Sequence, residues 1–314
     1  MKPGTPAQSA LKKCFFKELC VIRKCENKVQ LDDAESLHKL RISVRKTRAL
    51  LAHAKYVVPE RTITKYDREF KFLAQKTCNL RDLDVYLNTL SEHLCSARDN
   101  QHDIQNEIIN FINENKIREA QDLSEYLNSE KYTKLIEDWT GILDKPSSKY
   151  SRLKYANMPI EYVLKKGIIK QYQKMFRQGN EIDINSPYQK YHDLRKTCKK
   201  LRYLLEYFSD IQSRKIIRPI INELKKIQDI LGELQDYRIQ IALLNGFIDT
   251  KKSRNEYFDE SFKPVKLFIS KLDSKSQGIK SEYPVIFNKL LYKLNRKKYR
   301  KIFNNYKNMI DIKK

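Results

Sequence analysis

The sequence predicts an all-α protein made of two tandem four-helix-like bundles, related by a pseudo-twofold axis and enclosing a basic central groove. Three observations carry this prediction. Glycine and proline are scarce, at 7 and 9 of 314 residues, and no long run alternates β-branched with polar side chains as a sheet protein would. Apolar residues recur at helical spacing through long segments. The second half of the chain also repeats the first at a constant offset of 154 positions.

The repeat is clearest in two segments that share a pattern of histidine, arginine and leucine. HKLRISVRKTRALL occupies residues 38–51, and HDLRKTCKKLRYLL occupies residues 192–205. The same offset relates Asp82 in LRDLDVYL to Asp236 in LQDYRIQI. A chance match would not hold one register over both helices, so we expect two copies of one unit.

Apolar spacing and helix breakers place the individual helices. In the first copy we expect helices near 8–27, 33–58, 60–96 with a break around Thr77–Asn79, 100–115 and 117–142. In the second copy we expect helices near 159–178, 187–211, 214–247, 256–273 and 281–310. Short links between long amphipathic helices imply antiparallel bundles. The best linker is LDKPSSKYSR at 143–152, so the copies are placed at 1–155 and 156–314.

Each repeated helix is preceded by residues typical of a helix start. Asp32 and Glu35 have the spacing of a capping box, and so have Ser186 and Gln189. Pro187 would suit the first helical position. Because both pairs obey the same offset, the repeat predicts matching helix starts in the two copies.

Each repeated helix carries a line of cations along one edge. The first basic line is His38, Arg41, Arg45 and Arg48, and the second basic line is His192, Arg195, Lys199 and Arg202. At about 100° per residue, each line falls within an arc of roughly 80°. Leu40, Val44 and Leu51 fall on the adjacent arc and would face the core. Each line therefore runs beside the core-facing side, where it would line a groove between helices.

The charge balance indicates a polyanionic partner. Lys and Arg number 63 against 39 Asp and Glu, a formal net charge of +24, and such an excess opposes compaction. Arg41, Arg45 and Arg48 have no carboxylate three or four residues away, and arginine suits bidentate contact with phosphate oxygens. A solvated helix face would explain one such line, but repetition at matched positions favours a binding site. We expect Lys46 and Lys200, which also match across the repeat, to belong to it.

Four further side chains have more than one interpretation. His38 and His192 either play a structural part or donate to the anion, which would raise their pKa. Asp82 and Asp236 either cap the helix after a break or hold an arginine of the line in position. A metal site is disfavoured because Asp84 has no acidic counterpart in the second copy.

Other segments limit location and partners. Six cysteines form no C-x-x-C pair, which favours reduced thiols and a cytoplasmic protein. The N-terminal residues lack the apolar core of a signal peptide, and no stretch approaches the roughly 18 apolar residues of a membrane span. Residues 98–130 carry eight acidic against three basic side chains, and this acidic segment has no assigned role. The basic run at 289–301 either extends the binding surface or is a solvated end. Oligomeric state does not follow from the sequence.

These residues resemble the CHAD domain (conserved histidine α-helical domain) family. Its pattern is roughly H-x-L-R-x3-[RK]-x2-R-x-L-L in two tandem copies, each followed by a helix bearing L-x-D. Both copies are present, as HKLRISVRKTRALL with NLRDLDVYLNTL and as HDLRKTCKKLRYLLEYF with LGELQDYRIQIALL. The resemblance covers essentially the whole chain. The acidic E-x-E-x-K strand motif that opens the triphosphate-tunnel domain of some relatives does not occur.

The resemblance implies a pair of pseudo-symmetric helical bundles whose basic groove binds inorganic polyphosphate, and it implies an association with polyphosphate granules. Carried over by position, the two basic lines would form the lining of that groove. We therefore predict a cytoplasmic, non-catalytic polyphosphate-binding protein that needs no cofactor or metal.

Two other function classes compete with this prediction. A nucleic-acid binder is the alternative, because Tyr188 and Tyr203 fall near the second basic line and aromatic rings can stack on bases. The first line has Ala49 at the position of Tyr203, however, and no common nucleic-acid motif is visible. An enzyme is disfavoured because the sequence shows no phosphate-binding glycine loop, no H-E-x-x-H and no repeated acidic cluster.

Overall fold

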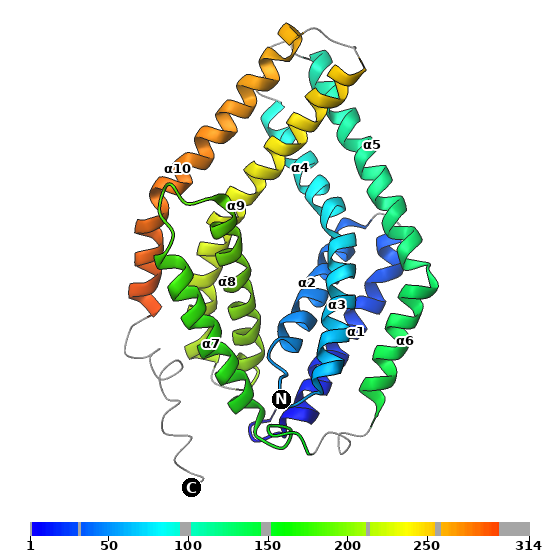
Figure 1. Ribbon diagram of the computed structural model, residues 1–314, viewed down its shortest axis with the longest axis vertical. Helices are drawn as coiled ribbons and strands as arrows, with labels where there is room; N and C mark the ends of the chain where they lie inside the picture. The colour runs from blue at the N-terminus through cyan, green and yellow to red at the C-terminus, as the bar shows by residue number, and fades with distance from the viewer. Residues whose placement is uncertain are drawn as a thin grey trace.

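The computed structural model describes residues 2–30, 33–94, 102–145, 152–211, 214–254 and 259–294. In these ranges the regular structure is helical, as predicted, and the only bridge contacts are isolated ones. Figure 1 shows the helices and their labels. The predicted all-α class is therefore confirmed.

Ten α-helices and one short 3₁₀ turn lie in the described part of the chain. The helices are α1 (Ala7–Gln30), α2 (Ala34–Leu51), α3 (Glu60–Lys76), α4 (Cys78–Leu94), α5 (His102–Leu127), α6 (Glu130–Asp144), α7 (Ile160–Asn180), α8 (Tyr188–Ser209), α9 (Arg214–Ser253) and α10 (Lys263–Leu294). The 3₁₀ turn η3 (Asp259–Phe262) leads into α10.

The predicted break around Thr77 is confirmed, and two other predicted breaks are wrong. Helix α5 runs through position 116 and ends at Leu127, and Ser129 then caps α6 by accepting the backbone N–H of Tyr132 at 3.3 Å. Helix α10 continues through 274–280 and through Pro284. The buried Tyr283 holds α10 in place next to Pro284, because its hydroxyl donates to the carbonyl of Gly179 on α7 at 3.0 Å. The predicted helical stretch beyond position 294 lies outside the described residues.

The predicted capping boxes are corrected by the structure. Helix α2 is capped by Asp33, whose carboxylate accepts the N–H groups of Glu35 and Ser36. Asp32 lies outside the described residues. At the start of α8 the cap position is Pro187, which makes no side-chain hydrogen bond. Ser186 bonds instead to Asp183 of the preceding turn, so the two helix starts differ.

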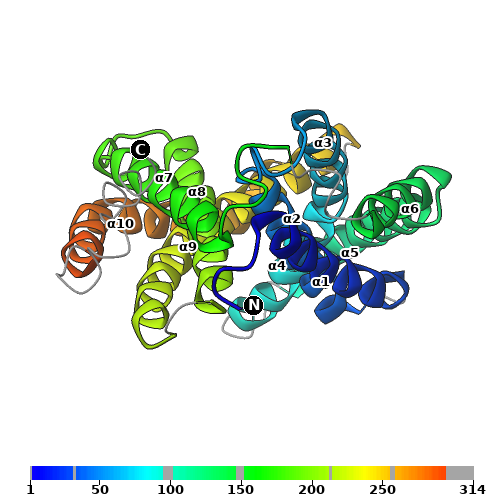
Figure 2. The ribbon, with the colours of Figure 1, turned by 90° about the horizontal axis from the view of Figure 1, so that it is seen from below.

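The helices form two groups that lie side by side. Helices α1 to α6 make one group and α7 to α10 the other, as Figure 1 shows. Contacts of α1 with α7 and of α2 with α8 join the groups at one end, and α9 contacts α4 and α5 at the other. Seen from below in Figure 2, α2 and α8 occupy the middle of the molecule.

The apolar core continues across the predicted boundary between the copies. One cluster of buried residues includes Leu40 and Val44 of α2 together with Leu194 and Leu201 of α8, all 0% exposed. A second cluster lies at the other end, where α4, α5, α9 and α10 meet around Phe247. The division at residue 155 and the pseudo-twofold relation remain predictions.

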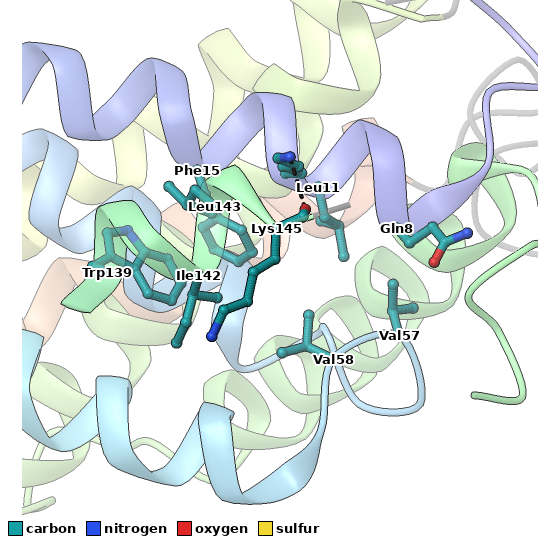
Figure 3. Close-up of a pocket in the computed structure, with 10 residues that line it drawn as sticks. Gln8, Leu11, Phe15, Val57, Val58, Trp139, Ile142, Leu143 and Lys145 are labelled. Atoms are coloured by element: carbon teal, nitrogen blue, oxygen red, sulfur yellow. Dashed lines mark hydrogen bonds between the residues drawn. The ribbon is translucent and has the colours of Figure 1, made fainter. Parts of the chain in front are cut away.

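An aromatic cluster fixes α6 against α1 and α3. The Trp139 ring lies 5.2 Å from Phe15 and 4.5 Å from Tyr66, centroid to centroid. Beside it, a small apolar pocket of about 40 Å³ opens between α1, α6 and the residues that follow α2 (Figure 3). Lys12 donates to the carbonyl of Lys145 at its edge, at 3.0 Å. This pocket contains no residue of either basic line.

Within the described residues, no helix has the length and apolar character needed to cross a bilayer.

Candidate functional site

The two basic lines lie on neighbouring helices, one on α2 and the other on α8. The sequence predicted that each line would run beside a core-facing side. Leu40, Val44 and Leu51 are all 0% exposed, as are Leu194 and Cys198 on α8. Because α2 and α8 contact each other, the buried sides bring the two lines together near the middle of the molecule.

Two of the three arginines of the first basic line are already bonded within the protein. Arg41 is only 6% exposed and donates to the backbone carbonyl and the hydroxyl of Thr77, and burial lowers the pKa of its guanidinium. The Nε of Arg48 lies 3.0 Å from the carboxylate of Asp67 on α3. Arg41 therefore holds α2 against the α3–α4 junction, and Arg48 holds it against the middle of α3.

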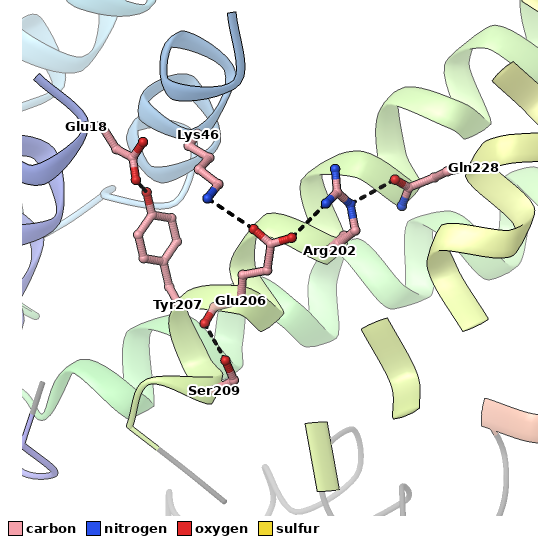
Figure 4. Close-up of polar contacts among 7 residues, drawn as sticks. All are labelled: Glu18, Lys46, Arg202, Glu206, Tyr207, Ser209 and Gln228. Atoms are coloured by element: carbon pink, nitrogen blue, oxygen red, sulfur yellow. Dashed lines mark hydrogen bonds and ion pairs between the residues drawn. The ribbon is translucent and has the colours of Figure 1, made fainter. Parts of the chain in front are cut away.

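The second basic line is bonded mainly to the next helix in the chain. Arg202 donates to Gln228 of α9 at 2.9 Å and to Glu206 at 2.7 Å. Lys46 of α2 lies 3.3 Å from the same Glu206 carboxylate, and Figure 4 shows Glu206 between the two cations. The ring Nδ1 of His192 is bonded to the side-chain oxygen of Gln235. The Glu206 carboxylate thus joins α2 to α8.

Three of the arginine and lysine residues of the lines lack such partners. Within the described residues, Arg45, Arg195 and Lys199 have neither a hydrogen bond nor an ion pair, and the buried Nε of Arg195 has no acceptor. Burial, followed by the positive charges of Arg45 and Arg195, lowers the pKa of Lys199 to about 6. Lys199 is therefore surrounded by like charge in a partly desolvated place, which disfavours its charged form. We call Arg45, Arg195 and Lys199 the open cation cluster.

Lys200 differs from its neighbour Lys199. It is an exposed residue on α8. Burial of its ammonium group, followed by the charge of Arg48, lowers its pKa, while the charge of Asp67 opposes the shift. Lys200 therefore lies on the Arg48 side of the lines rather than inside the open cation cluster.

Asp82 and Asp236 do not cap helices, because Asp82 lies inside α4 and Asp236 lies inside α9. They line a narrow pocket of about 10 Å³ between those two helices. Burial raises the pKa of Asp236, while the charges of Arg195 and Lys199 lower it. Asp236 and Arg195 therefore influence each other by charge, and the role of Asp236 in holding the arginine stays a prediction.

The two histidines have different surroundings. His38 is exposed, and partial burial of its ring together with the charge of Arg81 lowers its pKa. His192 is partly buried and its pKa is lowered by that burial, although the bond to Gln235 opposes the shift. Arg81 and Gln235 match at the offset of 154.

Sequence reasoning missed Arg81. Like the open cation cluster, it has no hydrogen bond or ion pair within the described residues. The repeat gave no signal for it, because Gln235 occupies the matching position. Sequence reasoning also missed Arg238, whose guanidinium lies 5.0 Å from the Tyr188 ring centroid. Both arginines add positive charge beside the lines.

The structure brings no cluster of three potential metal ligands together among the residues that it describes. A larger polar pocket of about 410 Å³ lies between α5 and the end of α9. It includes Glu107 and Glu114 of the acidic segment, and Lys251 forms an ion pair with Glu107 at 3.0 Å. This part of the acidic segment therefore lies against α9 and away from the basic lines.

Comparison with known proteins supports the all-helical fold. The family model for the CHAD domain matches residues 14–245. A crystal structure of the CHAD domain from the plant Ricinus communis superposes with a TM-score of 0.75, at 18% identity and over 93% of each chain. PptA from Streptomyces chartreusis superposes with a TM-score of 0.66, at 11% identity, over 92% of this chain and all of the other. No curated protein matches the sequence significantly. The chain therefore belongs to the CHAD domain family.

Proposed function

We propose that this CHAD domain protein binds inorganic polyphosphate without catalysis, in a basic groove between α2 and α8. The proposed lining is the set His38, Arg41, Arg45, Lys46, Arg48, His192, Arg195, Lys199, Lys200 and Arg202. A cytoplasmic location at polyphosphate granules is part of the same proposal. The proposal uses no metal ion or cofactor.

The open cation cluster is the observation that supports this function most directly. Arg45 on α2 and Arg195 and Lys199 on α8 have no carboxylate bonded to them among the described residues. Holding like charges together at partial burial opposes folding unless an anion offsets them. A phosphate chain between the two helices would supply that anion and would accept the free guanidinium donors in bidentate fashion.

The shape of the lines favours a chain over a single phosphate. Four residues spread from position 38 to 48 extend over about 15 Å of helix, longer than one phosphate group can contact. The cations already bonded to Asp67 and Glu206 follow the open cation cluster toward the C-terminal ends of α2 and α8. Successive phosphates could therefore meet cations along the whole length of the two helices.

Nucleic acid is the competing ligand, and the aromatic residues argue against it. Tyr203 is only 3% exposed, and the Arg202 guanidinium lies 4.8 Å from its ring centroid. Tyr188 is covered in a similar way by Arg238. Stacking on bases needs an open ring face, so these rings are poorly placed for a single strand.

A competition experiment tests the proposed function. Labelled long-chain polyphosphate is bound to the protein near physiological salt and challenged with single-stranded DNA, transfer RNA and orthophosphate at equal phosphate concentration. We expect only unlabelled polyphosphate to displace the label. Equal competition by the nucleic acids would assign the site to general polyanion binding. Absence of binding by the labelled chain would refute the proposal.

A further inference from the structure

Gly232 lies in the interior of α9 against the side chain of Arg195. A Cβ atom built on Gly232 would lie 2.9 Å from Nη2 and 3.5 Å from Nε of Arg195. The first distance is closer than real Cβ contacts allow, so the guanidinium occupies the space that a side chain at position 232 would need. A glycine inside a long helix is unfavourable for helix stability, so its presence here calls for a local reason.

The Arg195 guanidinium is held by its surroundings and not by hydrogen bonds within the described residues. Its Nε is fully buried and has no acceptor. The negative charge of Asp236 acts on it, and so does the positive charge of Arg45 from α2. The position of this guanidinium therefore depends on the space above Gly232.

Other residues of α9 hold the rest of the second basic line. Gln228 accepts from Arg202, and Gln235 is bonded to His192. Positions 228, 232 and 235 follow one another at intervals of four and three, so they share one face of the helix. That face of α9 lies against three members of the second basic line. Gln228 and Gln235 bond to theirs, and Gly232 lies against Arg195, which has no bonded partner within the described residues.

The first copy provides an internal comparison. Position 78, the match to position 232, carries Cys78, whose Sγ lies 3.7 Å from Nη2 of Arg41. Arg41 is bonded to the carbonyl and hydroxyl of Thr77. Where the matched position carries a side chain, Cys78, the arginine is hydrogen-bonded within the protein. Where it carries Gly232, the arginine has no hydrogen bond within the described residues.

We propose that Gly232 is a positioning residue. Because it has no side chain, the Arg195 guanidinium can lie beside Arg45 and Lys199 with its terminal Nη donors available to a phosphate chain. This inference rests on the proposed polyphosphate site, and it assigns to Gly232 the placement of one arginine in that site. An alanine at this position would push the guanidinium away, because a flexible side-chain end gives way more easily than helix backbone. The fold would remain, and the binding geometry would change.

The same helix offers a matched control in Gly246. A Cβ built there meets nothing within 4 Å. Gly232→Ala and Gly246→Ala therefore make the same change in helix propensity, and only the first disturbs Arg195. We expect each substitution to raise the melting temperature by roughly 2 °C. If Gly232 had only a structural role, Gly232→Ala would not raise the melting temperature and weaken polyphosphate binding at the same time.

The test measures binding of labelled long-chain polyphosphate by four variants and the unmodified protein. We expect Gly232→Ala to bind about tenfold more weakly, the loss of one charged hydrogen-bonding group, and Gly246→Ala to bind normally. Arg195→Met should bind weakly, and adding Gly232→Ala to it should cause no further loss, because both changes act through one guanidinium. Normal binding by Gly232→Ala, additive losses in the double variant, or loss of helical content in Gly232→Ala would overturn the inference.

A ligand-free measurement separates this inference from the proposed function. The Nε–H resonance of Arg195 should shift in Gly232→Ala and stay in place in Gly246→Ala, measured by arginine side-chain NMR and assigned with Arg195→Met. If the unmodified protein fails to bind polyphosphate while this shift occurs, the proposed function falls and the contact between Gly232 and Arg195 stands. If the resonance does not shift, the positioning role falls.

Discussion

The Lys46 ammonium group on α2 lies 3.3 Å from the Glu206 carboxylate on α8, and Arg202 reaches the other oxygen of that carboxylate at 2.7 Å. Glu206 thus binds one cation from each half of the repeat. Its side chain is partly buried, at 26% exposure, where charge-assisted hydrogen bonds are stronger than at an open surface. The carboxylate joins α2 to α8, and it also neutralises two cations of the proposed phosphate-binding surface.

Replacing Glu206 by glutamine tests these two effects at once. Glu206→Gln removes the negative charge and keeps the shape, so Lys46 and Arg202 become available to the ligand. We expect polyphosphate affinity to rise about fivefold, while unfolding free energy falls by about 1 kcal/mol. Isothermal titration and chemical denaturation measure the two quantities.

The control for this prediction is Asp138→Asn. Asp138 pairs with Lys65 at 2.8 Å between α6 and α3, so this variant makes the same change in net charge outside the basic lines. Its affinity should stay close to that of the unmodified protein. A weaker complex for Glu206→Gln would show that joining α2 to α8 matters more to binding than freeing two cations.

Charge reversal inside the open cation cluster should have the largest effect. Arg45→Glu together with Lys199→Glu should reduce polyphosphate affinity by well over tenfold, because two cations become repulsive. Circular dichroism should show unchanged helical content. Arg48→Ala is the informative comparison, since Arg48 is already bonded to Asp67 and should matter less. Full affinity in the double reversal would place the site elsewhere.

Chain length and salt should both control the affinity. Each phosphate that contacts a cation releases counterions, so affinity should fall steeply as salt concentration rises. Affinity should also rise with chain length until the two helices are covered. Removing Arg45 alone should reduce the slope of log affinity against log salt by about 1. Affinity independent of chain length would contradict binding along the lines.

The sequence predicted the placement of the lines because that placement depends on local periodicity. Leu40 and Val44 repeat at helical spacing and are buried, so the cations on the adjacent arc had to follow them to the edge of the core. The break at Thr77 was also predicted. Both features are encoded within a few neighbouring residues.

The spacing of residues along one helix does not predict which residues of other helices bond to its arginines. Arg41 and Arg48 lack a carboxylate within four residues, and yet the structure bonds them to Thr77 and Asp67. The predicted break at position 116 failed for a related reason. Lys116 there pairs with the Asp84 carboxylate of α4 at 3.2 Å, within a continuous α5. Tertiary contacts settle these points, and a single sequence does not record them.

The last prediction concerns protons taken up when the ligand binds. The pKa of Lys199 is lowered to about 6 by burial first, then by the charges of Arg45, Arg195, Arg41 and Arg202. The charge of Lys199 in turn lowers the pKa of Asp236, while burial raises that pKa. At pH 8 the free protein therefore holds Lys199 largely neutral.

A bound phosphate reverses this balance, because an opposite charge favours the ammonium form. Binding at pH 8 should therefore take up close to one proton at Lys199, and affinity should fall as pH rises above about 6. The same shift determines how Lys199 affects the stability of the ligand-free protein as pH changes. The pKa of Lys199 in the folded protein lies below the ordinary value of 10.5. Between these two pKa values the unfolded chain binds more protons than the folded protein. The contribution of Lys199 to the unfolding free energy should therefore rise with pH across that range.

Titration calorimetry at pH 8 in Tris and in HEPES measures the uptake, because these buffers differ in ionisation enthalpy. His38 and His192 also have lowered pKa values and can add to the uptake when phosphate binds. Lys199→Met removes only the lysine share, so the uptake in this variant should drop by nearly one proton while the histidine share remains. Equal uptake with and without Lys199 would mean that this ammonium group is already charged in the free protein, and that the open cation cluster does not depress its pKa.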